Sequence, residues 1–301
     1  MAWLSFPTGW IPDPPDRRDF GPVDDRLRKR IRSDAPAEAV IAEAPPQTSV
    51  DLTPWFPPVD SQVPFNSCTA SAAAGLLGYF ERKAFGNDVI ASRMFLYKVE
   101  RNLLGQTGDR GAFLRVAMKA LRAFGMPPEE YWPFDVALLD VEPSAFEYAF
   151  ATNYKAISYY RLDKQGVSAN ELVEAAKRTL ASSFPAMFGL ALYPSFEQAG
   201  SGRILVPFAH EQPVVLHALV CCGYDDAIET RARDPLTGQN VLARGAFRIR
   251  NSWGTVWGEE GYGWLPYDYV RRGLTSDWWT LTKADYLDTG EFGPGTAPER
   301  R

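Results

Sequence analysis

Apolar and small residues in the first half of the chain recur at helical spacing. Residues 68–80 begin with Cys-Thr-Ala-Ser-Ala-Ala-Ala-Gly and predict a helix whose small side chains allow close packing. Residues 92–104 and 113–124 each carry an apolar face with the same period, and they predict two further helices. Gly125, with two prolines shortly after it, ends the last of them. The first half of the chain therefore predicts a helical lobe over about 60–135.

The second half changes to short apolar runs that predict strands. One helix, residues 169–180, interrupts these runs. The five predicted strands are residues 154–162, 185–193, 213–224, 245–250 and 261–266. A group of helices followed by a group of strands is typical of the α+β class, in which the sheet is mostly antiparallel. We therefore expect a β lobe over about 136–288, packed on the helical lobe within a domain of residues 48–288.

Residues 1–47 differ from the rest of the chain. Eight prolines rule out continuous regular structure over most of this segment, where only residues 23–32 would form a short helix. The segment is nevertheless too apolar for a disordered tail. Its most apolar side chains are Trp3, Phe6, Trp10, Ile11 and Phe20. We interpret residues 1–47 as an extended arm that packs its aromatic side chains onto another surface.

The composition is that of an ordinary globular protein, with 46% apolar and 23% charged residues. The net charge of −5 favours neither nucleic acid nor an acidic membrane as a partner. No run approaches the roughly 18 apolar residues of a membrane span. The first residues lack the basic start and apolar core of a secretory signal. We expect a protein that is cytoplasmic, or exported without an N-terminal signal peptide, with a flexible tail over residues 289–301.

The three cysteines are too few, and odd in number, for a disulfide framework. Cys221 and Cys222 lie inside an apolar run, so we expect them in the core. Adjacent cysteines without other cysteines or histidines nearby make a poor metal site. Neither a metal nor a cofactor is expected.

A thiol, an imidazole and two carboxamides stand in contexts that suit a thiolate acyl-transfer site. Cys68 begins a predicted helix, where unpaired N–H groups and the positive end of the helix dipole stabilise a thiolate. His217 precedes an apolar strand and would hold the thiol proton, then deliver it to the leaving amine. Asn251 would fix the tautomer of that imidazole. Gln62 would aim its NH₂ group at the developing oxyanion, beside the N–H of Cys68.

Each of these residues also has an ordinary structural explanation. A free cysteine is usually a small buried residue, and a lone glutamine in a loop is usually solvated. The run Asn-Ser-Trp-Gly at 251–254 would also serve as a turn that closes a strand. His210 lies in a stretch rich in glycine and proline and is expected on a surface loop. The ordered set of four residues, rather than any one of them, predicts the site.

These motifs resemble the papain family of cysteine peptidases over residues 50–281. The resemblance rests on Gln62 with Asn66-Ser67-Cys68, on Leu216-His217-Ala218-Leu219-Val220 with Gly223-Tyr224, and on Asn251-Ser252-Trp253-Gly254 with Trp257-Gly258-Glu259 and Gly261-Tyr262. The last of these is the most specific. The resemblance implies a papain-like two-lobe α+β fold, with the active-site cleft between the helical lobe and an antiparallel β lobe.

The resemblance assigns roles residue by residue. Cys68 is similar to the family's nucleophile, His217 to its base and Asn251 to its orienting group. Gln62 resembles the oxyanion donor. Trp253 is similar to the tryptophan that shields the pair and lines the cleft for substrate.

Two further positions would bind substrate. Gly111, in the loop Gly108-Asp109-Arg110-Gly111, resembles the glycine that pairs with the substrate backbone. Ala218, directly after the base, would also contact substrate. The implied partners are polypeptide substrates, and the implied state is a monomer.

The chain also departs from the family pattern. Thr69 replaces the aromatic residue that usually follows the nucleophile, and Asn66 stands where glycine is common. The disulfide cysteines of secreted relatives and the long helical propeptide are missing. These departures look like an intracellular or unconventionally exported bacterial branch.

The leading functional hypothesis is an endopeptidase that forms a thioester on Cys68. An exopeptidase or a peptide ligase would use the same triad, and a catalytically silent binding protein would use the scaffold alone. For the arm we expect a position in cis across the cleft, as in a zymogen. The alternative is a permanent strap around the back of one lobe.

Overall fold

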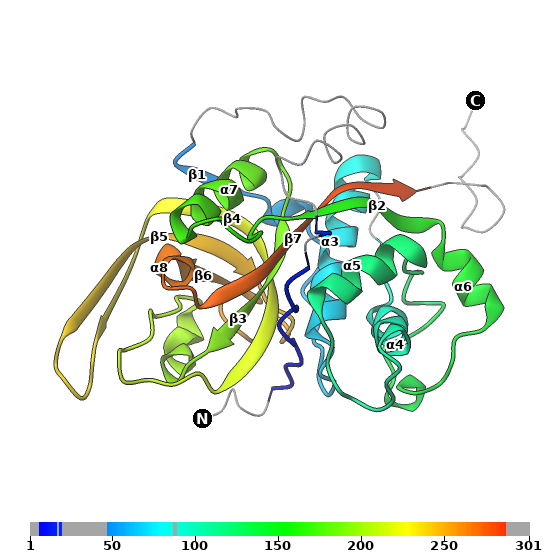
Figure 1. The fold of residues 1–301 in the computed structure, drawn as a ribbon, viewed down its shortest axis with the longest axis horizontal. Coiled ribbons are helices and arrows are strands. Elements are labelled where there is room, and N and C mark those ends of the chain that lie inside the picture. The colour runs from blue at the N-terminus through cyan, green and yellow to red at the C-terminus, as the bar shows by residue number, and fades with distance from the viewer. Residues whose placement is uncertain (1–5, 17, 20–46, 87–88, 287–301) are drawn as a thin grey trace.

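The computed structural model describes residues 6–16, 18–19, 47–86 and 89–286. Within them, most helices gather on one side and most strands on the other, so that two lobes lie side by side (Figure 1). The α+β two-lobe fold predicted from the sequence is confirmed. The described part of the arm, drawn in dark blue, runs between the lobes (Figure 1). The helix predicted at 23–32 and the tail at 289–301 lie outside the described residues.

Three predicted helices form most of the helical lobe. They are α3 (Cys68–Phe85), α4 (Arg93–Leu103) and α5 (Leu114–Ala123). Ser92 caps α4, because its hydroxyl accepts a hydrogen bond from the N–H of Phe95 at 3.1 Å. A shorter helix, α6 (Ala145–Ala151), was not predicted, although Ser144 and Glu147 form a capping box at its start. No described helix is both long and apolar enough to cross a membrane.

One antiparallel sheet, in the order β2-β7-β3-β4-β5-β6, forms the β lobe. Its strands are β2 (Tyr154–Arg161), β3 (Ala186–Leu192), β4 (Val215–Arg233), β5 (Asn240–Arg250), β6 (Tyr262–Pro266) and β7 (Thr275–Tyr286). A short strand, β1 (Ser49–Asp51), pairs with β4. The helices α7 (Ala169–Ala181) and α8 (Tyr267–Arg271) pack on β4 and β5.

The strands of the protein differ from the sequence prediction in length and in number. β4 and β5 continue beyond the predicted runs as a two-stranded hairpin that projects from the lobe (Figure 1). The strand β7 was not predicted, although it lies between β2 and β3. Its first residues are polar, because Asp277 faces buried polar groups of the arm, as described below.

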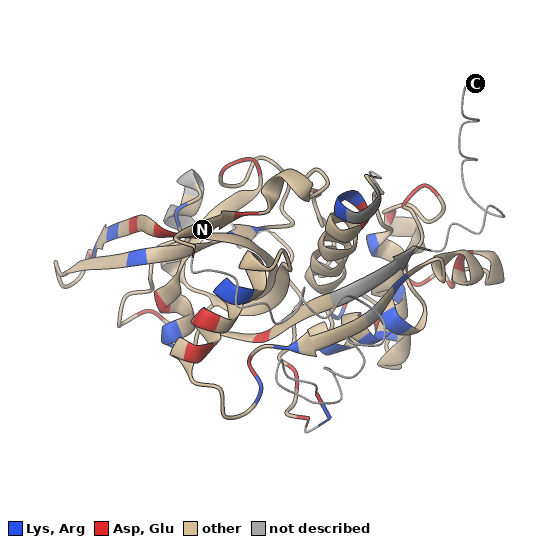
Figure 2. Ribbon diagram, turned by 90° about the horizontal axis from the view of Figure 1, so that it is seen from above, with Lys and Arg blue, Asp and Glu red and all other residues tan. Residues whose placement is uncertain are grey.

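The core continues from one lobe into the other through α3, which packs against β4 and β7. Trp278 is fully buried, and its ring stacks on Phe188 with 4.2 Å between the centroids. Cys221 and Cys222 are also fully buried and free, as expected. Charged residues of both signs are spread over both lobes (Figure 2).

Candidate active site

Cys68 is the first residue of α3, where the helical N–H groups lack partners within the helix. The backbone N–H groups of Thr69, Ala218 and Trp10 hydrogen-bond to its sulfur, and each lowers the pKa of the thiol. The stronger influence is burial, because the side chain is fully enclosed and its pKa rises to about 12. In this arrangement the sulfur is a neutral thiol surrounded by donors.

His217 and Asn251 lie side by side because β4 and β5 form one antiparallel pair, with Val220 opposite Arg250. The imidazole Nε2 and the Asn251 Oδ1 are 2.8 Å apart. Among the described residues, Nδ1 of His217 has no hydrogen-bond partner. Burial lowers the pKa of His217 to about 4, although the contact with Asn251 acts in the opposite direction. The imidazole is therefore neutral when the site is closed.

Trp253 covers the imidazole. Its ring stacks on His217 with 4.8 Å between centroids, and the ring of Phe6 from the arm stacks on Trp253 at 4.9 Å. Trp253 is 1% exposed. Water is thus excluded from one side of the His217–Asn251 contact, which strengthens that hydrogen bond.

Gln62 is fully buried, and its carboxamide is held at both ends. The oxygen accepts a hydrogen bond from the hydroxyl of Ser252 at 2.6 Å. The nitrogen donates to the carbonyl oxygens of Phe65 at 2.9 Å and Thr8 at 3.2 Å. Ser252 is a functional neighbour that the sequence reasoning did not single out, although it lies within the Asn-Ser-Trp-Gly motif.

The loop that contains Gly111 is fixed by Tyr97 and Asp109. The hydroxyl of Tyr97 donates to Asp109 at 2.6 Å and accepts from the N–H of Gly111 at 2.9 Å. Asp109 also accepts from the N–H of Asn66 at 2.9 Å, which ties the loop to the segment before Cys68. Gly111 has a φ of 73°, and a Cβ there would overlap the carbonyl of Gly9. Only glycine allows this close approach of two backbones.

The arm backbone pairs with this loop. The N–H of Ala112 donates to the carbonyl of Gly9, and the N–H of Ile11 donates to the carbonyl of Ala112, both at 2.9 Å. The N–H of Thr8 donates to Asn66 Oδ1 at 3.1 Å. The indole of Trp253 donates to the carbonyl of Pro7 at 3.2 Å. Residues 7–11 of the arm thus contact Asn66, the loop of Gly111 and Trp253.

Beyond residue 12 the arm is held by charged groups. Arg115 donates to both carboxylate oxygens of Asp19, at 3.0 and 2.7 Å, and to the carbonyl of Pro14 at 2.8 Å. The carboxylate of Asp13 accepts from the indole of Trp279 at 2.9 Å. Burial, and then repulsion by neighbouring Asp277, raise the pKa of Asp13 to about 6. The sequence reasoning missed these residues, because isolated charges usually indicate a solvated surface.

His210 lies outside this group. It is exposed, and its Nδ1 is 3.4 Å from Asp234 Oδ2.

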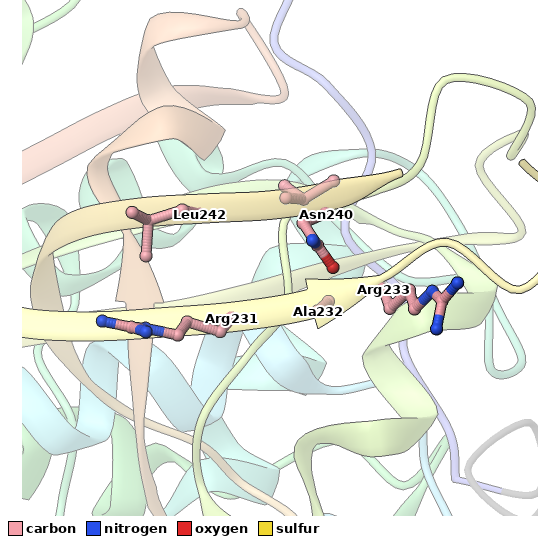
Figure 3. Close-up of a pocket in the computed structure, with 6 residues that line it drawn as sticks. Arg231, Ala232, Arg233, Asn240 and Leu242 are labelled. Carbon is pink, nitrogen blue, oxygen red and sulfur yellow. The ribbon is translucent and has the colours of Figure 1, made fainter. Parts of the chain in front are cut away.

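A shallow hollow lies elsewhere, between β4 and β5 at the far end of their hairpin (Figure 3). Within the described part of the chain, no three His, Cys, Asp or Glu side chains are grouped so that they could hold a metal ion.

The fold and the residues gathered at the cleft define the class of two-lobe cysteine peptidases. The model of the papain family cysteine proteases matches residues 48–276. The chain belongs to this family and is a hydrolase that acts on polypeptides.

The relatives that the chain resembles agree with this assignment. It is 29% identical over 296 residues to an uncharacterized peptidase C1-like protein of Acanthamoeba polyphaga mimivirus, covering 95% of this chain and 90% of the relative. Among solved structures it resembles xylellain, a cysteine protease from Xylella fastidiosa, with 32% identity and a TM-score of 0.71, over 92% of this chain and 96% of that one. The fold is also that of digestive procathepsin L 3 from the larval midgut of Tenebrio molitor, with 18% identity and a TM-score of 0.60, over 81% and 73% of the two chains.

Proposed function

We propose that the protein is an endopeptidase in which Cys68, His217 and Asn251 carry out thiolate catalysis. The Cys68 thiolate attacks the carbonyl carbon of the scissile bond. The His217 imidazolium gives its proton to the leaving amine, and the acyl group remains as a thioester on Cys68. Water then hydrolyses the thioester with His217 as the base, which releases the carboxylate and restores the thiol.

The observation that carries this proposal is the 2.8 Å contact between His217 Nε2 and Asn251. Because Asn251 occupies Nε2, the other ring nitrogen is left for proton exchange with the nucleophile. The backbone N–H of Ala218, the residue after His217, hydrogen-bonds to the sulfur of Cys68. Base and nucleophile therefore share one enclosed space.

Gln62 is proposed as the oxyanion donor, together with the backbone N–H of Cys68. A carbonyl oxygen of the arm, that of Thr8, already accepts from its carboxamide. The bond from Ser252 fixes which end of the carboxamide is the donor. A donor that is oriented before the reaction stabilises the charge that develops in the transition state.

We also propose that the arm inhibits the enzyme in cis. The arm uses the donor of Gln62 and pairs with the loop of Gly111, both of which a substrate would need. It also encloses Cys68 and His217, and the resulting burial favours the neutral thiol and imidazole over the reactive ion pair. These contacts favour inhibition over a strap around the back of a lobe.

Labelling of Cys68 tests both parts of the proposal. An epoxysuccinyl peptide should label the full-length protein slowly and irreversibly, and Cys68→Ala should abolish labelling and hydrolysis together. Removal of residues 1–40 should give a soluble enzyme that is faster on short peptides and is inhibited by the arm added in trans. Hydrolysis by Cys68→Ala would refute the mechanism, whereas an equally active truncated enzyme would refute inhibition alone.

A further inference from the structure

Glu100 is a fully buried carboxyl group that the mechanism proposed above does not use. It lies on α4, which packs against α3, the helix that begins with Cys68. The hydroxyl of Thr69, the residue directly after the nucleophile, donates a hydrogen bond to Glu100 Oε2 at 2.7 Å. The backbone N–H of Thr69 hydrogen-bonds to the sulfur of Cys68. One residue therefore contacts the nucleophile through its backbone and Glu100 through its side chain.

The surroundings of Glu100 favour its neutral form. Its second oxygen, Oε1, has no hydrogen-bond partner among the described residues. A buried carboxylate is costly unless donors or a cation satisfy both of its oxygens, and a neutral acid costs much less. Burial raises the pKa of Glu100 to about 8, although the hydrogen bond from Thr69 acts in the opposite direction. At neutral pH this side chain is therefore a carboxylic acid.

Neighbouring charged groups do little to change this state. The cation that acts on Glu100 is Arg101, the next residue of α4. Its guanidinium is directed elsewhere, because it donates to Asp140 at 2.6 Å and to the carbonyl of Gly108 at 3.0 Å. The charged residues of α3 lie at its opposite end, and those of α5, which also packs against α4, are exposed or paired with the arm; they are Glu81, Arg82, Lys83, Arg115, Lys119 and Arg122.

The charge on Glu100 matters to the nucleophile. When Glu100 is ionised, it raises the pKa of the Cys68 thiol, because two negative charges repel each other in a site that excludes water. The pKa of His217, by contrast, responds to burial and to Asn251. A charged Glu100 therefore acts on the sulfur rather than on the imidazole, and a neutral Glu100 leaves the thiolate unopposed.

We propose that Glu100 is a positioning residue for the nucleophile: as a neutral acid it holds Thr69 and the turn that presents Cys68, and as a carboxylate it opposes the Cys68 thiolate. The inference rests on the proposed function, in which Cys68 attacks as a thiolate. Thr69 replaces the aromatic residue that usually follows the nucleophile, so this contact arises where the chain departs from the family pattern. The first turn of α3 is thus held by a group that carries no charge below about pH 8.

A titration of the thiol tests the proposal without catalysis. The full-length chain with His217→Ala is compared with the same chain that also carries Glu100→Gln. Iodoacetamide alkylates Cys68 between pH 7 and pH 10, a range that includes a free thiol's pKa of about 8.5, and mass spectrometry of the peptide that contains Cys68 gives the rate. Glutamine keeps an acceptor for the hydroxyl of Thr69 but carries no charge. Glu100→Gln should therefore lower the midpoint of the alkylation profile and speed alkylation several-fold below that midpoint.

Glu142→Gln is the matched control, because Glu142 is an exposed carboxyl that pairs with Lys98, which also lies on α4. It should leave the midpoint unchanged. A midpoint that Glu100→Gln does not lower, or that Glu142→Gln lowers by as much, would overturn the proposal.

Thr69→Val and Thr69→Ser test the positioning role in the active enzyme. Valine has no hydroxyl, so Glu100 loses its donor and the first turn of α3 loses its bond to α4. We expect kcat on a short peptide to fall roughly tenfold with little change in KM, and Thr69→Ser to restore it to within a few-fold of the parent. Parental kcat in Thr69→Val, or equal losses in the two variants, would overturn the positioning role. If the enzyme cleaves no peptide, the proposed function fails, and the titration in His217→Ala still decides whether Glu100 acts on Cys68.

Discussion

The carboxamide of Gln62 donates a hydrogen bond to the carbonyl oxygen of Thr8 at 3.2 Å. The arm thus places an oxygen on the very group that we propose to stabilise the reaction's oxyanion. Substrate and arm cannot use this donor at the same time. The proposed inhibition and the proposed catalysis therefore compete for one and the same donor.

Gln62→Ala should lower kcat by roughly 10²- to 10³-fold with little change in KM, because the lost interaction is made in the transition state. Ser252→Ala leaves the carboxamide present but frees its oxygen, so it should lower kcat less. Steady-state kinetics on a short peptide would measure both. A kcat for Gln62→Ala equal to that of the parent would remove this residue from the site.

Gly9→Ala should activate the full-length enzyme. Gly9 has a φ of 121°, and a Cβ there would overlap the carbonyl of Asn66, so the arm must move away. The initial rate on a short peptide should rise roughly tenfold or more, since 1.4 kcal/mol of lost arm binding corresponds to tenfold. Gly105→Ala is the control, because Gly105 also has a positive φ but a Cβ there meets nothing within 4 Å. A folded Gly9→Ala protein with parental activity would contradict inhibition by the arm.

Arg115→Gln should also release the arm. It removes the two bonds to Asp19, a largely buried pair, and leaves Asp19 with the more distant guanidinium of Arg161, 3.7 Å away. We expect a several-fold higher initial rate that changes little with salt, because buried pairs are screened weakly. Asp19→Asn should act through the same contact, so the double variant should add little to either single one. Arg271→Gln, at an exposed pair with Asp268, should have no such effect.

Protonation of His217 and protonation of Asp13 should have opposite effects on the stability of the closed state, in which the arm covers Cys68. Burial lowers the pKa of His217 from 6.5 to about 4, so the closed state loses stability as pH falls through that interval. Burial raises the pKa of Asp13 from 3.8 to about 6, so the closed state gains stability as pH falls from about 6. Between pH 6 and pH 4 the two effects oppose each other. Acid should therefore not release the arm of the unmodified protein.

His217→Ala removes the opposing contribution of the imidazole and leaves that of the neighbouring carboxyl groups of Asp13 and Asp277, because burial raises the pKa of both. In this variant the Ile11 amide should become better protected from hydrogen exchange as the pH falls from 6 to 4, after correction for intrinsic exchange. Asp13→Ala should show the reverse slope. Protection that falls with acid in His217→Ala would show that neither Asp13 nor Asp277 takes up a proton on closure.

The repeating apolar patterns made much of the fold predictable. α3, α4, α5 and α7 all appear within a few residues of the predicted ranges, because their apolar faces follow the helical period. The pattern of apolar residues did not predict the strand β7. Its two adjacent tryptophans have different environments. Trp278 stacks on Phe188 in the core, and the indole of Trp279 donates a hydrogen bond to Asp13 of the arm.

The residues of the site also fall into two groups, those that the sequence predicted and those that it did not. Residues 62, 68, 217 and 251 stand in motifs with local chemical meaning, so the sequence identifies them as candidates. The groups that hold the arm have no such motif. Asp13 and Asp277, or Arg115 and Asp19, acquire their role only when distant segments meet, and each looks like a solvated charge in the sequence. Ser144 and Glu147, by contrast, form a local signal from which α6 was predictable.

The bond from Trp10 to Asp277 spans 267 positions of the chain. During synthesis the arm leaves the ribosome before the lobes that it contacts, yet its binding site on β7 exists only after the strand that carries Asp277 has been made. Asn251 and Trp253, which complete the cleft, also arrive late. The peptidase site and the segment that covers it are therefore finished within the same short stretch of translation. A nascent chain has almost no interval in which an assembled site stands open to the ribosome and to neighbouring proteins.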